Sequence, residues 1–245
     1  MYTVGRHNEH YDRPYGATDL AWFRVCASAK VDNLQALLGS RAGGVGTVLE
    51  VGMGSGVVLR EVERRGIGTQ WTGIDRIGEE AHRIPELAAS PIRQLEYDGR
   101  TLPFDDDSFD LVYASHVLEH VEDERGFLAE LARVARKWIF LEVPCELHFR
   151  ASVRALQATL DIGHINAYTP ESFALTLETS GLAIAEFGVF DHSVEVHRFG
   201  SSAPVAYAKT LLRRSALRLL PSLAPRLMTY HCGALCTSRH DEPAS

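Results

Sequence analysis

The sequence predicts an α/β fold: a doubly wound, mostly parallel seven-stranded sheet, with an N-terminal helix and a helical insert before the last strand. Two observations predict it. From residue 45 onward, short apolar segments alternate with segments of helical periodicity, as in open parallel sheets. The first apolar segment, 45–51, runs directly into the glycine-rich sequence 52–56 and then into a helix. This order is typical of a strand whose carboxyl end faces a ligand.

The remaining elements follow from periodicity and from turn residues. Apolar residues run continuously or alternate in the predicted strands 45–51, 69–75, 91–97, 109–115, 137–143, 183–190 and 227–238. Apolar residues recur at threes and fours in the predicted helices 17–39, 55–65, 77–88, 123–135 and 170–180. The last of these helices has Thr169 as its cap, Pro170 in its first turn and Gly181 at its end.

The length of 245 residues suits one large domain with its own core. We expect a single domain with four consecutive parts. They are an N-terminal arm and helix (1–40), a ligand-binding core (41–190), a helical insert (191–226), and a last strand and tail (227–245). The arm is a candidate lid over the ligand, because it carries Tyr2, Tyr11, Arg13 and Tyr15.

Composition excludes several classes of protein. The net charge of −7 argues against a general nucleic-acid binder, which carries a basic face. No apolar run approaches the roughly 20 residues that span a bilayer, and the first ten residues lack the apolar core of a signal peptide. We therefore expect a cytoplasmic protein. The four cysteines form no Cys-x-x-Cys pair, and His116 and His120, four residues apart, lack a clear third ligand. We expect no metal site.

The segment 203–226 has two interpretations. It carries four arginines among seven leucines up to residue 227, and Pro221 and Pro225 interrupt it. One interpretation is an amphipathic basic patch that makes weak peripheral contact with a membrane surface or with an acidic substrate. The other, which we favour, is a helical hairpin that buries its leucines on the sheet or in a homodimer contact.

The glycine spacing discriminates between ligands. A dinucleotide-binding loop reads Gly-x-Gly-x-x-Gly, and a phosphate-binding Walker loop ends in Gly-Lys-Ser/Thr. Here the third glycine comes after one residue, in Gly52-Met53-Gly54-Ser55-Gly56, and Glu50 lies two residues before the first. Asp75 ends the second predicted strand and is followed by Arg76. A carboxylate at this place can accept two hydrogen bonds from a ribose diol, so it indicates an adenosine ligand.

Two further motifs follow in order. The third predicted strand ends in Tyr97-Asp98-Gly99, before Leu102-Pro103-Phe104. The fourth ends at Ser115 and continues as His116-Val117-Leu118-Glu119-His120. With the glycine loop and Asp75, these motifs resemble class I S-adenosylmethionine (SAM)-dependent methyltransferases. The closest resemblance is to the small-molecule methyltransferases similar to those of quinone biosynthesis, and it extends to about residue 190.

The resemblance implies a Rossmann-like class I methyltransferase fold and a set of SAM-binding residues. It implies that the glycine loop cradles the methionine part of SAM, that Asp98 accepts from the adenine amino group, and that the fourth strand ends beside the sulfonium. The implied cofactor-binding residues are Glu50, Gly52, Met53, Gly54, Gly56, Asp75, Arg76, Asp98, Gly99 and Ser115.

The resemblance also implies in-line methyl transfer to a small-molecule acceptor, with S-adenosyl-L-homocysteine as product. We expect O-methylation in a biosynthetic pathway, while transfer to nitrogen or carbon stays open. A hydroxyl acceptor benefits from a general base, and histidine suits that role near neutral pH. His116 is the first candidate, because it follows the strand that ends at the sulfonium. His120, His148 and His164 are further catalytic candidates.

Two other functions stay open. An NAD(P)-dependent oxidoreductase is disfavoured by the glycine spacing, and no tyrosine is followed four residues later by the lysine of a hydride-transfer pair. A methyltransferase-like module that binds SAM without turnover is compatible with the same motifs. The Asn/Asp/Ser-Pro-Pro-Tyr/Phe signature of base-amino methyltransferases is absent, since residues 114–117 read Ala-Ser-His-Val. With the net acidity, this favours a small-molecule acceptor over DNA.

Overall fold

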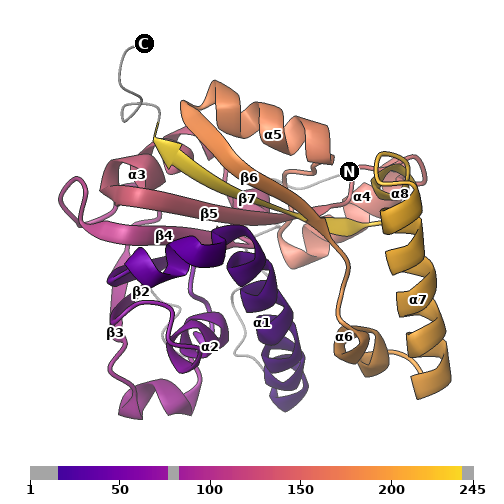
Figure 1. The fold of residues 1–245 in the computed structure, drawn as a ribbon, viewed down its shortest axis with the longest axis horizontal. Coiled ribbons are helices and arrows are strands. Elements are labelled where there is room, and N and C mark those ends of the chain that lie inside the picture. Colours follow the sequence, from indigo (N-terminus) through magenta and orange to yellow (C-terminus); the bar gives the residue numbers. More distant parts are fainter. Residues whose placement is uncertain (1–15, 77–82, 239–245) are drawn as a thin grey trace.

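The computed structural model describes residues 16–76 and 83–238 and is built around a seven-stranded sheet (Figure 1). The strand order is β3-β2-β1-β4-β5-β7-β6. Their bounds are β1 (Thr47–Val51), β2 (Gln70–Arg76), β3 (Arg93–Tyr97), β4 (Phe109–Ser115), β5 (Ala135–Cys145), β6 (Leu182–Phe190) and β7 (Tyr230–Ser238). Strands β1 to β5 pair in parallel, and β7 runs antiparallel between β5 and β6. The predicted doubly wound, mostly parallel sheet is confirmed.

Helices cover both faces of the sheet (Figure 1). Helices α1 (Ala17–Leu38) and α2 (Val57–Arg64) pack on one face, and α3 (Glu124–Val134) and α5 (Pro170–Thr179) pack on the other. Strand β4 contributes to the core on each face. Leu111 and Tyr113 pack in the core beneath α1 and α2, while Val112 and Ala114 pack in the core beneath α3 and α5. Since successive side chains of a strand point to opposite faces, a strand buried on both sides must be apolar throughout.

The element boundaries differ from the predicted ones in a few places. Strand β7 begins at Tyr230 rather than at residue 227, because Ala224–Leu227 form the short helix α8. Strand β5 begins at Ala135, which ends α3 one residue early. The predicted helix 77–88 is seen only as a 3-10 turn over Pro85–Ala89, and residues 77–82 lie outside the described part. The predicted cap of α5 is confirmed, since the Thr169 hydroxyl accepts from the Ser172 N–H at 3.0 Å.

Shorter helices complete the fold. A helix that the periodicity did not indicate, α4 (Val153–Thr159), follows β5, and the insert consists of α6 (Val194–Phe199), α7 (Ala203–Leu219) and α8. Helix α7 buries Ala206, Thr210 and Arg213. The interpretation that the insert buries its leucines on the sheet is wrong, because six of the seven are exposed, and the alternative homodimer contact stays a prediction. The exposed ones are Leu211, Leu212, Leu219, Leu220, Leu223 and Leu227. Small and polar side chains make the intramolecular contact instead.

Among residues 16–76 and 83–238, no helix is both long and apolar enough to cross a membrane. The candidate lid with Tyr2, Tyr11, Arg13 and Tyr15 lies outside these residues.

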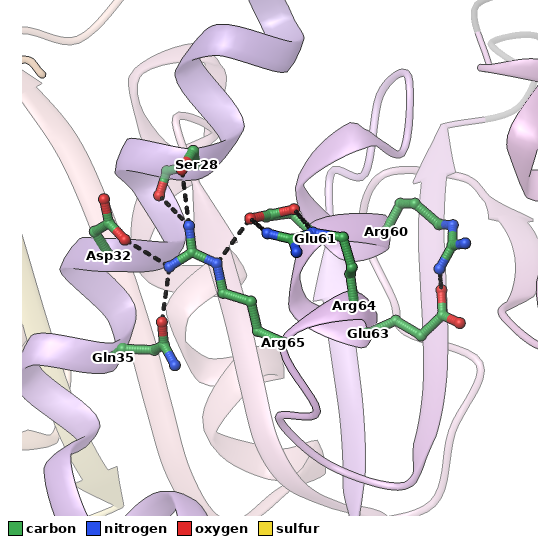
Figure 2. A network of polar contacts seen from close by, with 8 residues as sticks. All are labelled: Ser28, Asp32, Gln35, Arg60, Glu61, Glu63, Arg64 and Arg65. Carbon is green, nitrogen blue, oxygen red and sulfur yellow. Dashed lines mark hydrogen bonds and ion pairs between the residues drawn. The ribbon is translucent and has the colours of Figure 1, made fainter. Parts of the chain in front are cut away.

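A polar network fastens α1 to α2, which follows the glycine loop (Figure 2). Arg65, at the carboxyl end of α2, donates to Glu61 at 2.7 Å and to Asp32 at 2.5 Å. It also donates to Gln35 and Ser28 on α1. Its side chain is only 15% exposed, so its charge is largely removed from water. A guanidinium in this position is stabilised only because its donors are all occupied.

We expect Arg65→Met to lower the free energy of unfolding by about 2 kcal/mol, because charge-assisted hydrogen bonds are lost and the largely buried Glu61 carboxylate loses a partner. Urea denaturation measures this change in the free energy of unfolding. The matched control is Arg64→Met: Arg64 pairs only with Glu61 and is 65% exposed, so its loss should cost less than about 1 kcal/mol. Equal effects of the two substitutions would contradict the assigned role of Arg65.

Candidate active site

A cavity of about 1330 Å³ lies where the parallel strands end. The loops after β1, β2, β3 and β4 line it, together with α1, β7 and the loops after β5 and β6. Most of the residues singled out from the sequence line it. These are Glu50, Gly52, Met53, Gly54, Asp75, Arg76, Asp98, Gly99, Ser115, His116, His120 and His164. The topology therefore brings motifs from four strands to one edge of the sheet, as expected for an open parallel sheet.

The glycine loop contains two glycines with different tasks. Gly56 has a φ of +77°, and a Cβ there would lie 2.4 Å from Leu87 Cδ1, so packing requires glycine. Gly54 also has a positive φ, +48°, but a Cβ there would meet nothing within 4 Å. Since Gly54 lines the cavity, the space over it is open to a ligand that approaches the backbone. Gly56 itself is not among the lining residues and acts through the shape of the turn.

Three carboxylates surround this loop. Asp75, 7% exposed, accepts from the Gly54 and Arg76 N–H groups. Asp98 accepts from the Arg100 and Thr101 N–H groups at 2.8 and 3.1 Å, and these bonds lower the pKa of its carboxyl. Each oxygen of Asp75 accepts one bond and has a second lone pair, whereas both bonds to Asp98 go to Oδ1 and leave Oδ2 able to accept. Both side chains are thus fixed by the backbone and can still accept hydrogen bonds from a ligand.

Glu50 is the third carboxylate, and it is almost completely buried. Burial raises its pKa to about 8, although the charge of Lys30 opposes this rise. Its Oε2 atom has no hydrogen-bond partner among the described residues. With a pKa of about 8 this carboxyl is largely protonated at pH 7, because its charged form is costly when buried. A ligand with an ammonium or N–H group would remove that cost, and the methionine part of SAM carries such a group.

His116 has an unusual backbone conformation. Its φ of +60° is in the left-handed region, which non-glycine residues rarely adopt. Its N–H donates to the Glu142 carbonyl at 2.9 Å, which holds the chain in this turn directly after β4. Strained positions of this kind cluster at functional sites. The conformation directs attention to the contacts of the His116 ring.

The His116 ring joins Glu119 to His231. Its Nδ1 lies 3.2 Å from Glu119 Oε1, and its Nε2 lies 3.3 Å from Nδ1 of His231 on β7. Glu119 is fully buried. In the tautomer with the proton on Nδ1 of His116, facing Glu119, its Nε2 would accept from His231 and leave Nε2 of His231 unprotonated. Burial lowers the pKa of both rings well below the usual value, and neighbouring positive charges add to this. Both rings are therefore neutral at pH 7.

The other cavity histidines form a second pair. The rings of His120 and His164 meet edge to face with centroids 4.9 Å apart. Nδ1 of His164 lies 2.8 Å from Glu146 Oε2. Burial alone would lower the pKa of His164, but the bond to Glu146 and the charges of Glu119 and Glu146 raise it. The pKa of His164 is thus shifted upward, opposite in direction to that of His116.

Two predicted residues have other surroundings than expected. His148 is not among the residues that line the cavity, and its Nε2 contacts the Thr229 hydroxyl at 3.2 Å. The Ser115 hydroxyl donates to buried Glu142 at 2.7 Å, so its proton is already engaged. Asn33 donates to the other oxygen of Glu142 at 2.5 Å. The structure places Ser115 in the cavity wall as a positioned hydroxyl.

Sequence reasoning missed several residues of the cavity wall. Cys26, Lys30 and Asn33 line the cavity from α1. They recur at i, i+4 and i+7, a stripe beside the apolar stripe of that helix, and this spacing could have found them. His231 and His192 also line the cavity. No local signal marks these two, because only the antiparallel insertion of β7 brings His231 to this edge of the sheet.

Two groups of residues have the ligand types of a metal site. In His116, Glu142 and His231, one potential ligand atom of each residue lies within 4.8 Å of the others. The same holds for Glu119, His120 and His164. Two histidines and a carboxylate are a common set for divalent transition metals. In both groups the rings and carboxylates also contact one another, as described above. The expectation of no metal stays a prediction.

Comparison with known proteins identifies the core of the chain. Residues 49–138 match a family model described as a methyltransferase domain. Over 97 residues the chain is 34% identical to a phosphatidylethanolamine N-methyltransferase of Cereibacter sphaeroides, covering 38% of this chain and 46% of that protein. Over 98 residues it is 37% identical to a phthiotriol/phenolphthiotriol dimycocerosates methyltransferase of Mycobacterium tuberculosis, covering 36% of this chain and 33% of that protein. The matched region thus spans less than half the length of these curated relatives.

The fold extends this similarity over most of the chain. The geranyl diphosphate C-methyltransferase of Streptomyces coelicolor has a similar structure, with a TM-score of 0.60 and 14% identity over 85% of this chain and 75% of that chain. Residues 49–138 therefore match a methyltransferase domain, in agreement with the resemblance that the motifs indicated, and the fold of most of the chain is that of a class I methyltransferase. The glycine spacing that disfavoured a nicotinamide cofactor agrees with this result.

We expect Glu146→Gln to lower the pKa of His164, because the substitution removes a negative charge 2.8 Å from its ring. In the native protein the raised pKa adds stability that is complete below the unfolded value of about 6.5 and is lost as pH rises through the folded pKa. An NMR titration of the His164 ring measures the shift. Glu178→Gln, an exposed carboxylate outside the cavity, is the control. An unchanged His164 titration in Glu146→Gln would rule out the assigned contact.

Proposed function

We propose that the chain transfers the methyl group of SAM to a hydroxyl of a small-molecule acceptor, with S-adenosyl-L-homocysteine as product. The observation that carries the proposal is the arrangement of one cavity. The glycine loop and three carboxylates line one part of it, and His116 and His231 line another, with buried Glu119 against the His116 ring. The first part suits an adenosyl and methionine ligand, and the second suits an acceptor that loses a proton.

The residues present fit SAM at its polar groups. Glu50 would face the methionine ammonium, since its buried Oε2 has no partner among the described residues. Asp75 would accept from the ribose and Asp98 from the adenine amine, each through a free lone pair. Gly54 leaves its backbone accessible. Bound SAM supplies an electrophilic methyl group, and the protein supplies position and electrostatics.

The histidines give the acceptor a place to lose its proton. With Nδ1 of His116 facing Glu119 and Nε2 accepting from His231, the unprotonated Nε2 of His231 is the terminal acceptor. When His231 gains a proton, the buried carboxylate of Glu119 stabilises the positive charge through the His116 ring. The order of roles is the one by which a carboxylate orients a catalytic imidazole. This arrangement favours an acidic O–H acceptor, and the proton transfer needs no metal ion.

The named relatives and the size of the cavity bear on the class of the acceptor. The relatives named above include methyltransferases of phosphatidylethanolamine and of a dimycocerosate lipid, and the similar structure is of a geranyl diphosphate C-methyltransferase. A lipid-like or prenyl-like acceptor is compatible with the size of the cavity. A module that binds SAM without turnover is distinguished by an assay of S-adenosyl-L-homocysteine formation with metabolite and lipid extracts. Tight SAM binding with no product from any extract would favour the module.

We expect Gly54→Ala to weaken SAM binding by about tenfold or more, because its methyl group would occupy the open space over the loop. Calorimetric titration measures the affinity for SAM. Gly66→Ala is the matched control: Gly66 also has a positive φ and no atom within 4 Å of a Cβ, but it does not line the cavity. Both substitutions should cost about 1 kcal/mol of stability through backbone strain. If Gly54→Ala binds SAM as tightly as Gly66→Ala, the loop is not the cofactor site.

We expect His116→Ala and His231→Ala each to lower kcat by about 10²–10⁴-fold with SAM affinity nearly unchanged, since general-base catalysis typically contributes this much. Because the two rings act in one chain, the double variant should be no slower than the slower single variant. His148→Ala, outside the cavity wall, should keep nearly full activity. Since the pKa of both rings lies well below 6.5, activity should be constant at neutral pH and fall only in acid. If the losses in kcat of the two single variants multiply in the double variant, the two rings act independently and not in one chain.

A further inference from the structure

A patch of exposed apolar side chains lies where α7, α8 and the loop before α4 meet. The loop is joined to α8 by the Phe149 N–H, which donates to the Arg226 carbonyl at 2.7 Å. Figure 1 shows α8 at the end of α7, with α4 beside it. We call this the junction patch. Its members are Phe149, Val153, Leu219, Leu220, Leu223 and Leu227. Phe149 is 87% exposed and Leu219 is 76% exposed, values that a water-facing surface seldom shows for such large groups together.

Cations alternate with these apolar residues. Arg150 and Arg154 follow Phe149 and Val153 directly, and Arg218 precedes Leu219. All three arginines are exposed, and within the described part of the chain none forms an ion pair with an acid. Arg226 pairs with Glu171 at 3.3 Å, but both side chains are more than half exposed.

The charge distribution around the patch is one-sided. Residues 196–238 contain six lysines and arginines and no acid, and residues 147–160 contain Arg150 and Arg154 and no acid, although the whole chain carries −7. The junction patch therefore combines an apolar surface with local positive charge on an acidic protein. This combination fits an anionic bilayer surface, where apolar side chains enter the headgroup region and long cationic side chains reach the phosphates.

A second copy of the chain fits this surface less well. A twofold symmetric contact would place the junction patch against itself. Arg150, Arg154 and Arg218 would then face their own copies without an acid to pair with, and like charges across an interface are unfavourable. An anionic lipid surface pairs with the same cations.

We propose that the junction patch docks on the surface of an anionic lipid bilayer. The patch borders the histidine side of the cavity: Thr229, two residues after Leu227, lines the cavity and contacts His148. Ile162, which follows α4, also lines the cavity and is 45% exposed. If the proposed function holds, docking brings the acceptor side of the cavity to the membrane, so that a lipid-embedded acceptor can enter without crossing water.

Flotation of the full chain with vesicles tests the proposal without any methyl transfer. Vesicles of phosphatidylcholine alone are compared with vesicles in which about one third of the lipid is phosphatidylglycerol. We expect binding at least about tenfold tighter to the anionic vesicles, and weaker binding as salt is raised, because surface charge is screened. The double variant Arg150→Glu/Arg154→Glu should lose this preference. The double variant Phe149→Ser/Leu223→Ser should bind both kinds of vesicle more weakly.

Arg93→Glu is the matched charge control, since Arg93 is exposed on β3, at the far edge of the sheet. It should bind vesicles like the native chain. All variants should keep their SAM affinity, which separates failure of docking from failure of the proposed function. Equal binding to both kinds of vesicle, or none to either, overturns the proposal. So does a dimer, detected by light scattering and abolished by Leu219→Ser, in a chain that ignores vesicles.

Discussion

The structure depends on how the turn after β1 is fastened to the end of β2. The Ile74 carbonyl accepts from the Gly52 and Met53 N–H groups at 2.9 and 3.2 Å, and Asp75 accepts from the Gly54 N–H. These bonds fix the sharp turn that only glycines can make. They also place the carboxylate of Asp75 and the open backbone of Gly54 against the same space. The cofactor side of the cavity is thus a direct product of two neighbouring strands and needs no distant contact.

The acceptor side is assembled differently. Its residues come from α1, the turn after β4, the loops after β5 and β6, and β7. Buried carboxylates hold it together: Glu142 accepts from Asn33 and Ser115, and Glu119 lies against His116. Such buried charges are tolerable because each has hydrogen-bond donors or histidines nearby. Their electrostatic effects are opposite for neighbouring histidines, since the pKa of His116 is lowered and that of His164 is raised. One cavity therefore holds imidazoles whose pKa values are shifted in opposite directions.

The two sides differ in how far the sequence could predict them. Glycines and acids at strand ends are local signals, so the strands and the positions of Gly54, Asp75 and Asp98 followed from motif and periodicity. His231 could not be assigned, because its place depends on β7 entering between β5 and β6 against the parallel rule. The prediction for the insert was wrong for a different reason. Its leucines have the spacing of a buried helix, yet α7 makes its contact through Ala206, Thr210 and Arg213, and periodicity cannot tell which stripe turns inward.

The antiparallel position of β7 has a consequence for how activity arises during synthesis. Strands β1 to β5 and their helices already contain both tethers of the glycine turn and the three acids beside it. The terminal imidazole of the proposed proton path arrives only when β7 has been made and has inserted between two strands that are otherwise unpaired on those edges. A ribosome-bound chain stopped before residue 230 would hold the elements of a cofactor pocket but lack its proton acceptor. The proposed path of the proton is therefore complete only after folding has closed the sheet.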